Sequence, residues 1–497
     1  MGTFEDKDRT ASLVKIPASA WKVLAVLSSI ATMVMYAETM LLPAIPDLIR
    51  EFNVSYSMSS WILTAYLIPG AVMTPIAGKL SDIYGKKRIL LTIMAIYIAG
   101  ITIAGFSTNI YMLFAARATQ GIGMAMFVIA FGIIRDQFPR EKISIGQGVI
   151  SSMFASGAVI GLVAGGIIIS NYGWHATFLS TIPIAIALFV VIWRFSYERT
   201  HEPWEKAPQH PPPAAIPKGV DIKGAVALAT FVTSFLIALT LLETDSGQSI
   251  GQMATFVAIG AAALGLFVAI ERREKVPLVD FKLMSQRAIL PANLIIMVVG
   301  FSMFMVFQTV PVLVRNPVPL GFGGDAATAG YMQLPFAIVL LVFGPTSGFI
   351  VHKMGSIKPI IIGTSVTAAG FIFLLAFHSS WIAVAAGLAV LSTGLSLTNV
   401  GALNVTLLAT PVQFTGISVG MNTLLRIVGS SIGPALAGVY MQMYQSTIEV
   451  ADQPVAYPSM QAFSMIFLTA AMLSVASIAL SVYLKRRLGK MSIPNLT

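Results

Sequence analysis

The chain contains no cysteine and little charge, and both shortages narrow what it can be. Without cysteine it has no disulfide bond, no thiolate metal ligand and no cysteine nucleophile. Charged residues make up only 10% of the sequence, whereas hydrophobic residues make up 56%. Apolar runs of about 20 residues recur along the chain, which is the pattern of a helical membrane protein.

Catalytic signatures are missing as well. The five histidines lie in loops or at the ends of apolar runs, and the sequence has no H-E-x-x-H or Walker-type pattern. No polar segment is long enough to be a soluble catalytic or nucleotide-binding domain, and no stretch interleaves basic with aromatic residues. We therefore expect no enzyme activity, no metal or other cofactor and no nucleic-acid partner.

Fourteen apolar segments are long enough to cross a hydrocarbon core of about 30 Å as α-helices. Spanning β-strands would need only about 10 residues of alternating polarity, whereas these runs are longer and continuous. The expected fold class is all-α integral membrane. The spans lie near residues 21–45, 58–78, 89–107, 110–134, 144–169, 175–195, 224–243, 250–270, 288–312, 327–351, 357–377, 381–404, 415–441 and 461–484.

Lysine and arginine predict the orientation, because short cytoplasmic loops retain them. An N-terminus in the cytoplasm places 27 of the 31 basic residues on that side, with Arg50 and Arg315 outside and Arg117 and Arg426 in the membrane. The net charge of +10 then reflects topology and attraction to anionic inner-leaflet lipid. We expect a multi-pass protein of the cell membrane, in contact with membrane lipid, with both termini in the cytoplasm.

Polar interruptions divide the chain into two groups of six helices and one pair. The longest interruption carries six prolines and is expected to be a semi-rigid or disordered cytoplasmic linker. The expected segments are an N-terminal cytoplasmic stretch (1–20), a six-helix bundle (21–196), the proline-rich linker (197–223), an inserted helix pair (224–271), a cytoplasmic loop (272–287), a second six-helix bundle (288–485) and a cytoplasmic tail (486–497).

An internal repeat supports two matched bundles. The segments from Gly78 to Arg88 and from Gly348 to Lys358 each have a glycine, a second glycine seven residues on and a cation ten residues on. Both follow the second helix of their bundle. Duplicated six-helix halves with a substrate site near the midplane are the build of major facilitator transporters.

The first of these loops resembles the signature loop of the major facilitator superfamily, although Ile83 replaces the usual basic residue. In that family the loop latches the two halves together on the cytoplasmic side. A generic positive-inside loop would explain the cations but not the spacing of the glycines. The residues that carry the resemblance are Gly78, Leu80, Asp82, Gly85, Lys86 and Lys87.

The fourth predicted helix resembles the motif of proton-coupled members of the family, in Leu113, Arg117, Gln120, Gly121, Gly123 and Ala125. The resemblance implies that Arg117 faces the central cavity and biases the protonation of a nearby acid. The alternative is that Arg117 hydrogen-bonds backbone groups and Gln120 and so braces the bundle.

Glu38 is the acid in question, because it lies inside an otherwise apolar run. A carboxylate there is costly and marks a functional site by default. Glu38 lies eight residues before Pro46 and Arg117 seven after Ile110, so both sit about 10 to 12 Å from the outer boundary.

The segment around Glu38 also resembles the acidic first-helix motif of multidrug antiporters, where the residue is usually aspartate. We predict that Glu38 and Arg117 couple transport to protons. A permanently neutral structural carboxyl is the alternative.

Glycine-rich helices form a further resemblance to antiporters. The fifth helix carries Gly157, Gly161, Gly165 and Gly166, with Leu162 where the antiporter motif has proline, and the thirteenth carries Arg426, Gly429, Gly433 and Pro434. Ordinary close packing of small residues would produce the same pattern. Arg426 lies near the midplane, so its partner is a polar side chain, backbone, Glu38 or an anionic substrate.

Other polar residues on the predicted helices are candidates for lining the cavity, although each could instead make an interhelical hydrogen bond worth about 0.6 kcal/mol. With Arg426, the candidates are Tyr36, Gln120, Gln308, Gln333, Asn399 and Asn422.

Taken together, the chain resembles the 14-helix drug:proton antiporter branch of the family. The resemblance implies a monomeric secondary transporter that exports hydrophobic or cationic drug-like compounds by alternating access, with the proton gradient as energy source. Two alternatives stay open. One is a proton-coupled importer of a small organic solute, favoured by Leu162, and the other is a membrane sensor that binds without transporting.

Overall fold

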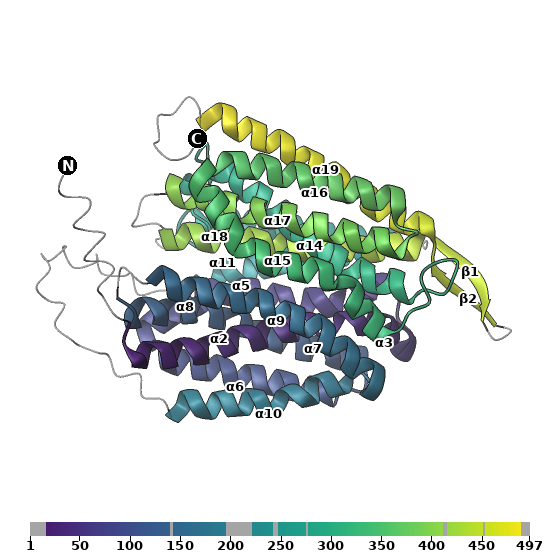
Figure 1. Cartoon of the computed structure of the whole chain (residues 1–497), viewed down its shortest axis with the longest axis horizontal. Coiled ribbons are helices and arrows are strands. Elements are labelled where there is room, and N and C mark those ends of the chain that lie inside the picture. The colour runs from purple at the N-terminus through teal and green to yellow at the C-terminus, as the bar shows by residue number, and fades with distance from the viewer. Residues whose placement is uncertain are drawn as a thin grey trace, which may run out of the picture.

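Two bundles of long helices lie side by side in the computed structural model, the N-terminal half against the C-terminal half (Figure 1). The structure describes residues 16–139, 143–194, 221–241, 247–274, 277–410, 415–450 and 453–488. The first helix begins and the last helix ends at one end of the molecule, and a β-hairpin projects from the opposite end. We call the hairpin end outer and the other end cytoplasmic, following the orientation that the basic residues predict.

The N-terminal bundle consists of α2 (Ala18–Thr39), the 3₁₀ turn η1 (Leu42–Ala44), α3 (Ile45–Phe52), α4 (Tyr56–Ser59), α5 (Trp61–Tyr84), α6 (Lys86–Gly105), α7 (Ile110–Gly121), η2 (Ile122–Ala125), α8 (Met126–Gln137), α9 (Ile143–Tyr172) and α10 (His175–Arg194). The inserted pair is α11 (Ile222–Thr240) and α12 (Gly247–Glu271), followed by the short α13 (Phe281–Met284). The C-terminal bundle consists of α14 (Ile289–Arg315), α15 (Ala326–Met354), α16 (Ile357–Phe377), α17 (Trp381–Ala409), α18 (Thr415–Met443) and α19 (Met460–Leu488).

A helix or helical segment occupies each of the fourteen predicted positions. Among the described residues, twelve helical segments are long and apolar enough to cross a membrane. The helices at the other two predicted positions are α5 and α9. The all-α membrane fold is confirmed, and the count of fourteen crossings stays a prediction.

Glycine stripes set the closest helix contacts in both halves. A β-carbon on Gly161 would lie 2.1 Å from the Thr39 hydroxyl, so α9 approaches the end of α2 directly. A β-carbon on Gly429 would lie 1.9 Å from the Met297 carbonyl oxygen, so α18 approaches α14 equally closely. Gly157, Gly165 and Gly433 meet backbone atoms in the same two contacts. Because a side chain at these positions would push the helices apart, the stripes fix where Glu38 and Arg426 lie.

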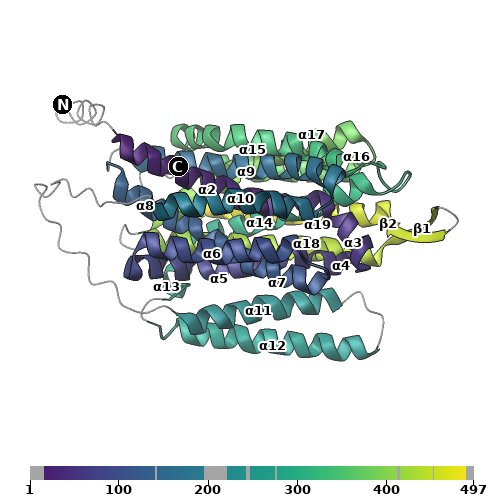
Figure 2. The same cartoon turned by 90° about the horizontal axis from the view of Figure 1, so that it is seen from below.

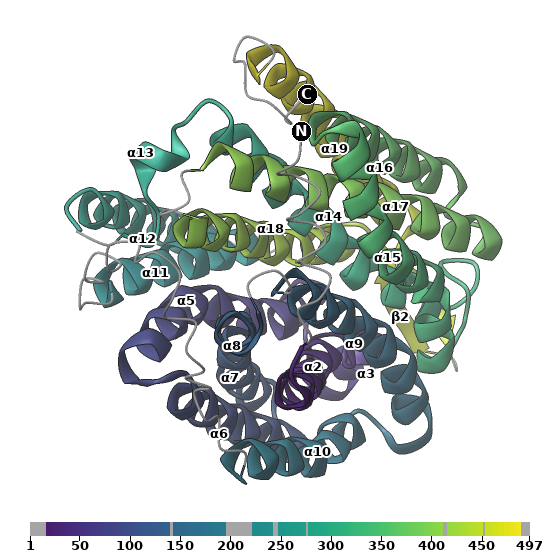
Figure 3. The ribbon, with the colours of Figure 1, turned by 60° about the vertical axis from the view of Figure 1, so that its left-hand side comes forward.

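The inserted pair lies at the edge of the molecule, as Figure 2 shows. It packs through α11 against α5 of the N-terminal bundle and α18 of the C-terminal bundle (Figure 3). At the outer end the indole of Trp61 donates to the Thr240 hydroxyl at 3.2 Å. The pair therefore covers the seam between the two bundles on one side.

A two-stranded antiparallel hairpin joins α18 to α19 outside the helical bundles. It consists of β1 (Gln445–Val450) and β2 (Gln453–Pro458). The side-chain amide of Asn316, after α14, donates to the Pro458 carbonyl at 3.1 Å and fixes the hairpin to the bundle. The hairpin was not predicted, although three of the six residues of β1 are β-branched, as is typical of strands.

Several predicted segments lie partly outside the described residues. The structure describes only 221–223 of the proline-rich linker, 16–20 of the N-terminal stretch and 486–488 of the tail. Their predicted character stays a prediction.

Candidate functional site

Glu38 is the next-to-last residue of α2 and is 2% exposed. Its Oε2 atom has no hydrogen-bond partner in the described part of the chain. The neighbouring Thr39 hydroxyl donates to the Ala158 carbonyl of α9 at 3.1 Å and holds this end of α2 in place. A buried carboxyl oxygen without a donor is costly in a membrane protein, so the position calls for a functional explanation.

Arg117 of α7 is fully buried, and its guanidinium donates hydrogen bonds mainly to backbone carbonyls. Its Nη1 donates to Ala37 at 2.8 Å and to the side chain of Gln120 at 3.2 Å, and its Nε donates to Ile62 at 3.1 Å. The guanidinium also stacks over the Tyr66 ring, 4.5 Å from its centroid. A cation at the carbonyl end of α2 is favoured by the helix dipole.

This geometry supports the bracing role that the sequence analysis left as an alternative. Arg117 Nη2 lies 3.5 Å from the backbone oxygen of Glu38, so the two residues are neighbours, as their depth predicted. The described residues contain no ion pair between the two side chains. In this conformation Arg117 holds the backbone that carries Glu38 while the carboxyl group stays unpaired.

Arg426 of α18 brings the third intramembrane charge to the same region. Its side chain is partly buried, and it makes no hydrogen bond or ion pair with any described residue. Glu38 is attracted electrostatically to Arg426 first and to Arg117 second. The region therefore joins one acid of the N-terminal bundle to one base from each bundle.

Buried side-chain amides with unpaired atoms lie at a similar depth. In the described residues, Gln120 Nε2, Gln308 Oε1 and both polar atoms of Gln333 have no hydrogen-bond partner. Gln308 lies seven residues before the outer end of α14 and Gln333 seven residues after the start of α15, each about 10 Å from the outer boundary. Since buried polar atoms are almost always hydrogen-bonded, we expect water or a ligand to form hydrogen bonds with these atoms.

The structure gives three further predicted cavity residues their own surroundings. The Tyr36 hydroxyl lies against Ser180 and Thr181 of α10, within its own bundle. The Asn422 amide donates to Asn293 of α14 at 3.0 Å and so braces α18 against α14. Asn399 is partly buried on α17. The polar atoms of Tyr36 and Asn422 thus have protein partners, and their place in a cavity stays a prediction.

The predicted cytoplasmic latch makes its described contacts inside the N-terminal bundle. Gly85, with φ of +93°, turns the chain between α5 and α6. Lys86 donates to the Gly132 carbonyl at 3.1 Å and forms an ion pair with Asp136 of α8, and Lys87 donates to the Trp193 carbonyl of α10. These contacts lie within the N-terminal bundle, and a latch between the bundles stays a prediction.

The other two latch residues lie on α5. A β-carbon on Gly78 would lie 3.0 Å from Val128 of α8. Asp82 belongs to α5, and its side chain lies outside what the structure describes.

Contacts between the bundles concentrate at their outer ends. Arg315 of α14 pairs with Asp47 of α3, and Gln308 donates to the Ser59 hydroxyl of α4 at 3.1 Å. A β-carbon on Gly166 of α9 would lie 2.6 Å from the Ala326 carbonyl oxygen of α15. The molecule is thus closed toward the outside. No sequence pattern singled out Asp47. Arg315 stood out only as one of the two cations predicted on the outer side.

A second tie across the outer seam joins Ser170 of α9 to Asp325, the N-cap of α15. The Ser170 hydroxyl donates to Asp325 at 3.2 Å. Hydrogen bonds from Thr328, with a smaller contribution from Ser170, lower the pKa of Asp325 below its usual value. Asp325 therefore stays ionised and available as an acceptor at neutral pH.

Breaking the Arg315–Asp47 pair is expected to open the outer end. Arg315→Ala removes this pair and the bond to the Pro43 carbonyl, so the populations should shift toward an outward-open form. Spin labels on cysteines placed at Tyr172 and Val318, which are 79% and 71% exposed, would report a longer distance. The chain has no cysteine of its own to remove.

Arg50→Ala is the matched control, because Arg50 is an exposed cation at the same end. An unchanged distance distribution in the Arg315 variant would contradict the proposed role of the pair.

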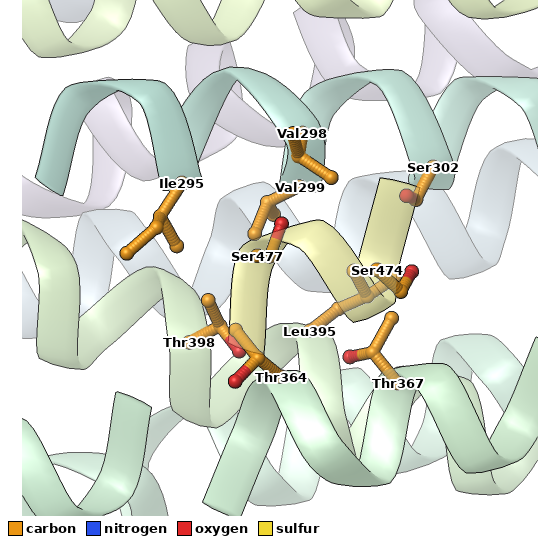
Figure 4. A pocket seen from close by; sticks show the side chains of 10 residues that line it. All are labelled: Ile295, Val298, Val299, Ser302, Thr364, Thr367, Leu395, Thr398, Ser474 and Ser477. Carbon is orange, nitrogen blue, oxygen red and sulfur yellow. The ribbon is translucent and has the colours of Figure 1, made fainter. Parts of the chain in front are cut away.

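A small crevice within the C-terminal bundle is distinct from this region. Hydroxyl and aliphatic side chains from α14, α16, α17 and α19 line it, among them Ser302, Thr364 and Ser474 (Figure 4). It has room for about one water molecule and not for a drug-sized compound. Its hydroxyls mostly bond their own helices, as Thr364 does to Ile360 at 2.9 Å. The crevice is a packing defect rather than a substrate site.

Known proteins resemble this chain over most of its length. An uncharacterized MFS-type transporter of Mycobacterium tuberculosis is 27% identical over 409 residues, which is 81% of this chain and 56% of that relative. The multidrug transporter protein MdtP of Bacillus subtilis is 26% identical over 421 residues, covering 83% of this chain and 74% of MdtP. The chain thus spans only about half of the first relative.

Solved structures share the fold. The crystal structure of the human organic anion transporter MFSD10 superposes with a TM-score of 0.61 at 15% identity, covering 94% of this chain and 100% of that protein. The family model of the Major Facilitator Superfamily matches residues 27–434, from the first helix through the glycine stripe of α18. The chain therefore belongs to the Major Facilitator Superfamily of membrane transporters.

Proposed function

We propose that the protein is a proton-coupled exporter of hydrophobic, drug-like compounds that works by alternating access. The observation that carries the proposal is the buried Glu38 carboxyl, whose Oε2 lacks a partner. A group of this kind can take a proton from one side and release it to the other as the bundles move. The name of the relative MdtP, a multidrug transporter, supports the same substrate class.

The charges around the site refine the substrate class. Arg117 and Arg426 outnumber Glu38, so the central region carries excess positive charge. Neutral hydrophobic compounds are therefore favoured over cations, which the two arginines repel. A cation would have to bind next to the ionised Glu38 carboxylate and displace the proton there.

A proton-coupled importer of an anionic organic solute is the second candidate. Arg426 favours it, because this partly buried cation has no partner among the described residues and could bind an anionic group. Binding of the anion and of a proton at Glu38 would then reinforce each other, which leads to symport. Antiport needs the opposite, namely competition between substrate and proton.

Dye transport in proteoliposomes tests the proposal. Under antiport, an acidic lumen drives a neutral hydrophobic dye inward as protons leave. Under symport, an acidic exterior drives an anionic dye inward together with protons. Accumulation only with the acidic exterior would overturn the export proposal in favour of the importer, and binding without accumulation under either gradient would indicate a sensor.

A further inference from the structure

Two buried carboxyl groups meet at the cytoplasmic end of the inserted helix pair, far along α11 and α12 from the outer contacts. Asp221 is the N-cap of α11 and is 6% exposed, and Glu271 ends α12 and is 3% exposed. In each carboxyl group, one oxygen accepts a hydrogen bond from the backbone. Asp221 Oδ1 accepts from the Gly224 N–H at 2.7 Å, and Glu271 Oε2 accepts from the Val279 N–H at 3.1 Å.

The remaining oxygens face each other without a donor between them. Asp221 Oδ2 and Glu271 Oε1 lie 2.1 and 2.8 Å from the position that a β-carbon on Gly224 would take. The two carboxyl groups are within hydrogen-bond reach. Neither oxygen has a hydrogen-bond partner among the described residues, and both side chains are more than nine-tenths buried. Two ionised carboxylates in this position would repel each other strongly.

Among the residues that the structure describes, the charged groups nearby do not neutralise the pair. Lys79 of α5 attracts Asp221 and Glu274, but in the described residues it forms no ion pair with either. On the pair's own elements, Lys223, Arg272, Arg273 and Glu274 are exposed. On the segment packed against Glu271, Asp280 is occupied as the cap of α13, accepting from Leu283 at 2.9 Å, and Lys282 is exposed.

We propose that Asp221 and Glu271 form a second proton-binding site, in which one proton bridges Oδ2 and Oε1 and fastens the inserted pair at its cytoplasmic end. One carboxyl group carries the proton and donates it to the carboxylate of the other, as paired carboxyls do elsewhere. The bridge ties the start of α11 to the end of α12, and through Val279 to the segment that leads into α13 and α14. It is independent of Glu38.

The site makes this corner of the protein sensitive to cytoplasmic pH. The closed corner holds a proton that the separated, hydrated carboxyls give up at any pH above about 5. Closing is therefore linked to proton uptake, so the corner is stable at low pH and loosens as the pH rises. Because α11 packs on α5 and α18, loosening would weaken the cover over the seam between the bundles.

Hydrogen–deuterium exchange of the full-length protein in detergent tests the proposal. The backbone N–H groups of Gly224 and Val279 donate directly to the two carboxyls, so their exchange reports the state of the bridge. After correction for the intrinsic rate, their protection in the wild type should fall between about pH 5 and about pH 7, by up to about tenfold per pH unit, the limit for one linked proton, because separated carboxyl groups lose their protons near pH 4.

Glu271→Gln is expected to remove this pH dependence. Its amide N–H₂ can donate to Asp221 while its carbonyl still accepts from Val279, which mimics the protonated bridge at every pH. Asp221→Asn provides the same test from the other side and serves if the first variant does not fold. Glu274→Gln is the control, because it removes the same charge three residues on from an exposed position.

The outcomes are distinct. A slope that is present in the wild type and in Glu274→Gln but lost in Glu271→Gln supports the bridging proton. A wild type without the slope, a slope unchanged by Glu271→Gln, or a slope lost equally in Glu274→Gln overturns it.

Discussion

Glu38→Gln is expected to abolish gradient-driven accumulation of substrate. If one proton is exchanged per molecule, a gradient of about one pH unit is worth about 1.4 kcal/mol and sustains about tenfold accumulation. The amide cannot release a proton, so the ratio of inside to outside dye should fall to unity in proteoliposomes. Binding of the dye and its movement down a concentration gradient should persist, because the site keeps its shape.

Two companion variants make this result specific. Glu38→Asp keeps a titratable group one methylene shorter, and the resembling antiporter motif usually has aspartate, so transport should survive. Glu449→Gln removes a carboxyl from the exposed face of the hairpin and should leave accumulation unchanged. Uphill transport that persists in Glu38→Gln would show that the proton is carried elsewhere.

Arg117→Ala is expected to destabilise the whole protein. It leaves the carbonyl oxygens of Ala37 and Ile62 and the side-chain oxygen of Gln120 without their buried donor. Each unpaired buried group costs about 1–3 kcal/mol, so the loss should be several kcal/mol and visible as a large fall in the melting temperature in detergent. The cavity left by a fully buried arginine adds to this.

The same variant separates bracing from proton coupling. If Arg117 only biased protonation of Glu38, Arg117→Ala would keep its melting temperature and lose transport alone. Arg117→Lys keeps the charge but lacks the planar fork that reaches several carbonyls, so we expect intermediate stability. Arg50→Ala, at an exposed outer position, controls for the loss of a positive charge.

The sequence alone placed the helices and the three intramembrane charges, because apolar length and the cost of buried charge leave local signals. It also predicted the shared depth of Glu38 and Arg117. It left open whether Arg117 donates to backbone carbonyls and could not name them, since those partners come from α2 and α5.

The partners of single side chains depend on which helices meet, and no local pattern encodes that. Asp47 and Arg315 looked like ordinary solvated charges, yet they join the two bundles. Asp221 and Glu271 lie at opposite ends of the inserted pair in sequence, and only the packing of α11 on α12 brings their carboxyl groups together. Lys86 and Lys87 match a latch motif, and only the packing of α6 against α8 and α10 gives them carbonyl partners at Gly132 and Trp193.

The amino-acid sequence by itself determined that this is a helical membrane protein, because insertion into lipid is decided segment by segment from apolar length and loop charge. Tertiary structure decided which polar atoms stay without partners, and therefore where protons and substrate are expected to bind. Helix packing brings these atoms together from positions hundreds of residues apart, and the energy of a buried polar group depends on the neighbours it finds there.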